Sequence, residues 1–95
     1  MPVVFVIPGA LRQLAGDRSE IRLPFEGGSL AEALDTLWAA APALRDRVLT
    51  ELNHVRPHIN VFVDGRNARD IGELSAQVEP DSEIVLLPAV SGGSR

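Results

Sequence analysis

Two adjacent glycines near the carboxyl end are the residues of this chain that point most directly to chemistry. Gly92-Gly93 follows Leu-Leu-Pro-Ala-Val-Ser and precedes Ser94-Arg95. Glycine has no side chain and accepts nearly any backbone angle, so such a segment can enter a narrow site on another protein. The chain also has Gly27-Gly28, where only a turn is expected. Residue types alone therefore leave two interpretations open: a reactive carboxyl end at Gly93, or a disordered terminus without a role.

Other side chains that could carry chemistry are scarce. The chain has no cysteine, which excludes disulfides, thiolate metal sites and a cysteine nucleophile. His54 and His58 flank a proline and have no third ligand nearby, so no metal site is expected. Paired carboxylates and nucleophile–base arrangements do not stand out, and no catalytic residue is expected. With no thiol and no catalytic arrangement, the carboxyl end is the unusual candidate for chemistry.

The composition is that of one small globular domain. The chain has 95 residues and a net charge of −4, which argues against a nucleic-acid partner and favours docking on a basic protein surface. No signal peptide is evident and the apolar runs are too short to span a membrane, so a cytoplasmic protein is expected. All nine basic residues are arginine. Without lysine, the chain cannot form lysine-linked polymers of itself.

The first half of the chain is predicted to form a strand hairpin and then a helix. The β-branched run at 3–7 indicates a buried strand, and the alternation at 20–25 indicates a half-buried strand paired with it. A loop with one helical turn is expected between them. Ser29 and Glu32 have the spacing of a capping box at a helix start. The apolar stripe of that helix consists of Leu30, Leu34, Leu37, Trp38 and Ala41.

The second half is predicted to add a short helix and three strands. Its expected elements are a helix at 43–49, a polar connection at 50–57, a strand at 59–63, a hairpin turn at Asp64-Gly65, a return strand at 67–68, a helical turn at 71–74, a turn at Pro80-Asp81 and a strand at 83–87. One long helix on one face of a mixed sheet is an α+β architecture. Residues 89–95 carry no pattern, so we expect a domain at 1–88 and a flexible tail at 89–95.

The strands themselves suggest a docking surface. Residues alternate between the two faces of a strand, and a single helix layer covers only one face of the sheet. Phe62, Val85 and Leu87 should therefore form an exposed apolar patch, unless the short helix or a loop covers them. Such patches usually mark a partner surface.

Three stretches of the chain resemble the MoaD/ThiS family of sulfur carriers. They are the opening Val-Phe-Val-Ile-Pro with Ala10-Leu11-Arg12, the central Arg-Pro-His-Ile-Asn-Val-Phe-Val-Asp-Gly at 56–65, and Asp-Ser-Glu-Ile-Val-Leu-Leu-Pro-Ala-Val-Ser-Gly-Gly at 81–93. They occur in the family's order and nearly span the chain. The resemblance implies a ubiquitin-like β-grasp fold, with a mixed sheet of four to five strands packed on one main helix.

The resemblance also implies a role as carrier rather than enzyme. An adenylating enzyme related to ubiquitin-activating enzymes would use ATP to convert the Gly93 carboxylate into an acyl-adenylate, and a sulfur donor would displace AMP to leave a thiocarboxylate. Ser91 and Gly92 would pass through the partner's active site and place Gly93 at the reacting groups. The sulfur would pass to a biosynthetic enzyme of molybdopterin, thiamine, cysteine or natural-product synthesis. The carrier itself would bind no cofactor, because the ATP belongs to the partner.

The end of the chain departs from the family pattern. Family members commonly stop at the second glycine, whereas Ser94-Arg95 follows here. We expect a peptidase to cut between Gly93 and Ser94, since some relatives are matured by a zinc-dependent JAMM-type metalloprotease. Two alternatives remain: a ubiquitin-like modifier whose matured Gly93 is joined to lysines of other proteins, and a β-grasp interaction module whose tail does nothing.

Overall fold

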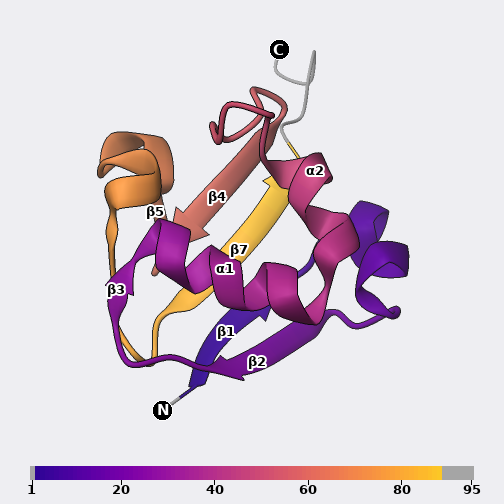
Figure 1. Cartoon of the computed structure of the whole chain (residues 1–95), viewed down its shortest axis with the longest axis horizontal. Coiled ribbons are helices and arrows are strands. Elements are labelled where there is room, and N and C mark those ends of the chain that lie inside the picture. Colours follow the sequence, from indigo (N-terminus) through magenta and orange to yellow (C-terminus); the bar gives the residue numbers. More distant parts are fainter. Residues whose placement is uncertain (1, 89–95) are drawn as a thin grey trace.

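A computed structural model describes residues 2–88, and the tail predicted at 89–95 lies outside these described residues (Figure 1). The chain begins with the predicted hairpin: β1 (Pro2–Val6) pairs antiparallel with β2 (Glu20–Pro24). A seven-residue 3-10 helix, η1 (Gly9–Ala15), fills most of the connection, where a single helical turn was predicted. β2 is the edge strand on this side of the sheet, and β1 is the next strand in.

The capping box predicted at Ser29 is present and starts α1 (Leu30–Ala40). The Glu32 amide donates a hydrogen bond to the Ser29 hydroxyl at 3.1 Å, and the Ser29 amide donates one to the Glu32 carboxylate at 2.8 Å. A cap of this kind stabilises a helix by about 1 kcal/mol. Gly28 has a φ of 152°, and a Cβ there would lie 2.5 Å from Oε1 of Glu32. The cap therefore requires glycine at this position.

The predicted short helix at 43–49 is present in two pieces, η2 (Pro42–Leu44) and α2 (Arg45–Val48). The predicted polar connection after it contains a short hairpin, the 49–55 hairpin, closed by a bridge between Leu49 and Val55. The hydroxyl of Thr50 accepts hydrogen bonds from two amides within it. This segment is therefore an ordered hairpin that stands beside α1.

The main sheet has the strand order β2-β1-β7-β4-β5. Its second half consists of β4 (Ile59–Val63), β5 (Arg66–Asn67) and β7 (Glu83–Pro88). β7 pairs parallel with β1 and antiparallel with β4, which makes the sheet mixed, as predicted. The last strand of the chain thus lies in the middle of the sheet (Figure 1).

The predicted Asp64-Gly65 turn joins β4 to β5, and both residues have the positive φ that a two-residue hairpin turn of this hand requires. The Asp64 carboxylate also accepts two hydrogen bonds, from the Glu83 amide at 2.9 Å and from the Ser82 hydroxyl at 2.7 Å. The Ser82 hydroxyl accepts in turn from the Glu79 amide. Ser82 is buried, so these bonds provide its hydroxyl with partners in place of water. They also fix the start of β7 to the turn.

The helices cover one face of the sheet, and the core lies between the two layers (Figure 1). Its fully buried members from the sheet alternate along the strands, and those from the helices form the predicted stripe; the largest are Phe5, Ile7, Leu30, Leu34, Leu37, Leu44, Ile84 and Leu86. Trp38 packs against this core, as predicted, but it lies at the edge and is only half-buried. The α+β architecture predicted from the sequence is confirmed.

Short elements account for the remaining differences. A two-stranded sheet of β3 (Gly28–Ser29) and β6 (Gln77–Val78) was not predicted, because two residues are too few to show an alternating pattern. The predicted return strand at 67–68 is shifted by one residue, and Ala68 instead starts η3 (Ala68–Asp70). The helical turn predicted at 71–74 is η4 (Glu73–Ser75).

Candidate functional site

The predicted reactive end, with its residues Ser91, Gly92, Gly93 and Ser94, lies outside the described part of the chain. The structure describes the strand that carries this end. β7 ends at Pro88, opposite Ile59 of β4, and has a neighbouring strand on each side. Its inward side chains are fully buried in the core. The tail therefore starts from a central, firmly anchored strand.

The predicted partner residues Phe62, Val85 and Leu87 lie together on the sheet face that the helices leave uncovered. Phe62 is directly opposite Val85 in the β4–β7 ladder, and Leu87 lies two residues along β7 on the same face. Leu87 is 43% exposed, and the other two residues are half-buried. The predicted exposure of this patch is thus found, while its use by a partner remains a prediction.

Two further members of this patch were missed by sequence reasoning. Val4 and Val6 of β1 are half-buried on the same face, with Val6 directly opposite Val85. We call Val4, Val6, Phe62, Val85 and Leu87 the open face. The run at 3–7 was expected to be buried throughout, but only Val3, Phe5 and Ile7 point into the core. Because every residue from 3 to 7 is apolar, the sequence does not show which of them face the core and which face the open side of the sheet.

Polar groups border the open face at both sheet edges. On β2, Arg22 and Glu20 form an exposed ion pair at 3.2 Å, opposite Val4 and Val6. An exposed pair of this kind contributes little to stability, about 0–1 kcal/mol. Its position in register with the open face instead makes it a polar rim, which is the usual border of a docking surface.

Arg69 forms the other border and is held by a network of hydrogen bonds. Its guanidinium donates to the side chain of Asn60 at 2.7 Å and to the backbone carbonyls of Arg56 and Ile59 at 2.7 and 2.8 Å. The Asn67 side chain donates to the same Asn60 oxygen. This arginine therefore ties the start of β4 to the segment after β5, and its fixed position adds a positive charge beside the open face.

A basic hollow lies next to the point where β7 ends. Arg47, Arg56, His58 and Asp46 line a cavity of about 300 Å³. Arg56 is positioned by a 2.7 Å hydrogen bond to the Asp46 carbonyl oxygen, and its own carbonyl accepts from the Ile59 amide. Because Ile59 pairs with Pro88, these cationic side chains stand close to the base of the tail. Arg47 was missed by sequence reasoning, since only the turn of α2 brings it beside Arg56.

Within residues 2–88, no cluster of three or more histidine, cysteine or acidic side chains could hold a metal ion. His54 is instead 3.6 Å from a carboxylate oxygen of Glu73, and His58 lies exposed in the basic hollow. No helix in this part of the chain is long and apolar enough to cross a membrane.

Comparison with known proteins gives one consistent result. The ThiS family matches residues 5–93 of the chain. Small archaeal modifier protein 1 of Haloferax volcanii is 38% identical over 84 residues, which are 87% of this chain and 91% of that protein. Its crystal structure superposes with a TM-score of 0.79 at 30% identity, covering 98% of this chain and 100% of that one. The crystal structure of the Amycolatopsis orientalis BexX/CysO complex contains a chain that superposes with a TM-score of 0.85 at 27% identity, covering 96% and 99%. These likenesses confirm the predicted ubiquitin-like β-grasp fold.

Proposed function

The chain belongs to the ThiS family of small ubiquitin-like sulfur carriers and modifiers, and from that premise we propose that it is a sulfur carrier whose working group is the carboxyl end of Gly93. The observation that carries this proposal is the position of β7. A central strand, paired with β1 at 83–85 and with β4 as far as Pro88, delivers the chain to Pro88, and the diglycine follows within five residues. The match to the family also extends to Gly93.

The chemistry needs an activating partner, because a carboxylate is a poor acyl donor. The Gly93 carboxylate oxygen attacks the α-phosphate of ATP in the partner's site, pyrophosphate leaves, and an acyl-adenylate forms. The terminal sulfur of a persulfide donor then attacks the acyl carbon and AMP leaves, which gives an acyl disulfide. A second thiol attacks the donor's inner sulfur, so the S–S bond of the acyl disulfide breaks, the donor becomes a disulfide and the thiocarboxylate remains on Gly93. Water must be excluded from the adenylate during these steps. Ser91 and Gly92 are small enough to pass through a narrow channel into such a closed site.

The geometry sets how far the tail can reach into that partner. Five residues in extended conformation span at most about 18 Å, at roughly 3.3–3.6 Å per residue. The partner must therefore hold the carrier by a surface close to the end of β7. The open face fits this requirement, since Leu87 belongs to it and directly precedes Pro88. The basic hollow borders the same end and would attract a local acidic patch, within a partner surface that the net charge of −4 still predicts to be basic elsewhere.

Ser94 and Arg95 must be removed before Gly93 has a free carboxylate. Cleavage of the Gly93–Ser94 peptide bond by a protease, with a JAMM-type metalloprotease as our candidate, would release the dipeptide and complete the carrier. A sulfur-accepting biosynthetic enzyme is the partner that follows activation.

The intact mass of the protein purified from its own host tests this function. We expect the loss of Ser94 and Arg95 and, in part of the population, replacement of one oxygen by sulfur. A chain that keeps both residues and all its oxygens while the sulfur pathway is running would refute the carrier role at Gly93. The same preparation treated with a thiol-alkylating reagent should gain one label per thiocarboxylate, although the chain contains no cysteine.

A protein modifier is the second candidate, favoured by the 38% identity to small archaeal modifier protein 1. Here the activated Gly93 would be joined to lysine side chains of other proteins. Since this chain has no lysine, each conjugate would carry single copies and no lysine-linked chains. A series of higher-mass conjugates in host extract, detected through a tag at the amino terminus and lost when Gly93 is deleted, would establish the modifier function.

A further inference from the structure

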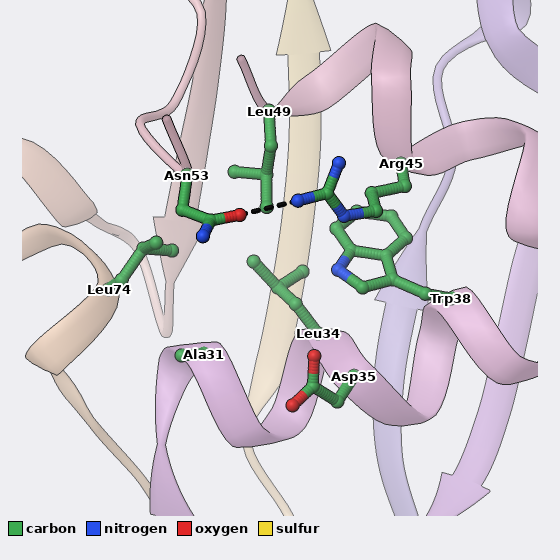
Figure 2. A pocket seen from close by; sticks show the side chains of 8 residues that line it. All are labelled: Ala31, Leu34, Asp35, Trp38, Arg45, Leu49, Asn53 and Leu74. Atoms are coloured by element: carbon green, nitrogen blue, oxygen red, sulfur yellow. Dashed lines mark hydrogen bonds between the residues drawn. The ribbon is translucent and has the colours of Figure 1, made fainter. Parts of the chain in front are cut away.

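A second concave surface lies on the helical side of the molecule, opposite the open face. A pocket of about 270 Å³ lies between α1, α2, the 49–55 hairpin and η4, and Figure 2 shows the side chains that line it. The carrier chemistry proposed above involves the sheet and the tail and makes no use of this pocket. Its lining residues are Ala31, Leu34, Asp35, Trp38, Arg45, Leu49, Asn53 and Leu74.

The floor of the pocket is apolar. Leu34 is fully buried and, in the view of Figure 2, projects from α1 toward the hairpin, with Leu49 across from it and Leu74 to one side. Trp38 lies one turn further along α1 and is half-buried, so part of its indole faces the pocket. An aromatic wall over an aliphatic floor favours a ligand group that is long, partly apolar and flat at its end.

The two charged residues at the mouth of the pocket, Arg45 and Asp35, differ in whether they have a partner within the chain. Arg45 donates hydrogen bonds to Oδ1 of Asn53 and, at 3.3 Å, to the carboxylate of Asp46, so its charge is already compensated. Asp35 is exposed, and none of the residues from 2 to 88 forms a hydrogen bond or ion pair with its carboxylate. Asp35 and Trp38 are three residues apart on one helix and therefore share a face. Of the two charged groups that line this pocket, Asp35 is therefore the one without a partner among residues 2–88.

We propose that this pocket binds an arginine side chain of a partner protein. The volume lies just below the range of about 300–1,000 Å³ typical of small-molecule sites and suits one large side chain. The methylene stem of an arginine would cover Ala31 and Leu74, its planar guanidinium would stack on Trp38, and two of its N–H groups would donate to Asp35. Arginine and tryptophan are also the residue types that most often dominate binding energy at interfaces.

This site does not rest on the sulfur chemistry. Because it lies on the side of the molecule away from the open face, a protein bound here would leave that face and the base of the tail accessible. The carrier could thus be held by one protein while another acts on its carboxyl end. Failure of either proposal leaves the other untouched.

The single tryptophan of the chain provides a direct readout. In a ¹H–¹⁵N NMR titration of the full chain, the indole N–H of Trp38 is one resolved signal. The probe is the peptide acetyl-Gly-Arg-Gly-amide. The control peptide has citrulline in place of arginine, which keeps the shape of the side chain and removes its charge. Asp35→Asn removes the proposed carboxylate at an exposed position. Asp17→Asn is the matched protein control, because Asp17 is exposed after η1 and does not line the pocket.

We expect the arginine peptide to shift the Trp38 signal in a saturable way, with apparent affinity about five-fold weaker for Asp35→Asn and unchanged for Asp17→Asn. Equal shifts with the citrulline peptide, or no effect of Asp35→Asn, would overturn the proposal. A shift that depends on protein concentration and disappears in Leu52→Ser would assign the pocket to a second copy instead. Binding of the peptide only by a chain ending at Gly93 would assign it to this chain's own Arg95.

Discussion

Replacing Asp64 by asparagine tests whether the turn before β5 holds the start of the tail-bearing strand in place. The carboxylate accepts two hydrogen bonds, from Ser82 and from the Glu83 amide, and asparagine has only one acceptor oxygen. Asparagine also keeps the positive φ that the turn needs. Hydrogen bonds to a charged group contribute about 1.5–3 kcal/mol, and the exposed position of Asp64 reduces this, so we expect a loss of about 1–2 kcal/mol.

For a domain of this length such a loss lowers Tm by roughly 4–16 °C, which thermal unfolding followed by circular dichroism resolves easily. Ser82→Ala removes the other partner, and the double variant should lose less than the sum of the two single losses. Asp81→Asn is the control, since Asp81 is exposed and accepts no hydrogen bond from another described residue. Equal stability of the Asp64 and Asp81 variants, or strictly additive losses with Ser82→Ala, would refute the bracing role.

Three further changes test other parts of the structure. Gly28→Ala should reduce the free energy of unfolding by about 1–2 kcal/mol in urea titrations, because its Cβ would displace the Glu32 carboxylate from the cap. Leu87→Ser should lower Tm by only a few °C, since Leu87 is 43% exposed, but raise the KM for the carrier several-fold in an ATP–pyrophosphate exchange assay with the activating enzyme. Arg47→Gln should slow association with that enzyme at low salt, measured by stopped flow, and the difference should vanish at high salt.

Each of these changes has a matched control. Gly9→Ala places a Cβ where no atom lies within 4 Å and should cost less than Gly28→Ala. Leu52→Ser removes a leucine that is 79% exposed in the 49–55 hairpin and should not alter the exchange assay. Arg66→Gln makes the same charge change near the opposite end of β4. If the Leu52 or Arg66 variants behave like their test counterparts, the open face or the basic hollow has been wrongly assigned.

The fold was predictable from the sequence because its main elements have strong local signals. Ser29 and Glu32 identify the helix start, Asp64-Gly65 identifies the hairpin, and the order of strands around one helix fixes the layers. What the sequence could not supply depends on contacts between distant segments. The pairing of β3 with β6 and the approach of Arg47 to Arg56 are examples, since neither has a local period.

The candidate site divides in the same way. The diglycine at Gly92-Gly93 and the patch of Phe62, Val85 and Leu87 follow from residue type and alternation. The membership of Val4 and Val6 in the open face depends on which neighbours of an all-apolar strand face the helix. The pairing register with β7 is needed to assign the faces, because every residue in the run is apolar and could be buried.

The parallel pairing of β1 with β7 also bears on when the protein can fold during its synthesis. Val4 lies opposite Glu83, so the first strand finds its central neighbour only after almost the whole chain has left the ribosome. Until then β1 has only β2 beside it, and the core side chains of β7 are missing. Contacts this distant in sequence slow folding, and a chain interrupted before β7 would keep an unpaired apolar edge that chaperones and proteases recognise. The strand that presents the working end is thus the same one that completes the sheet, which couples possession of a diglycine tail to a finished fold.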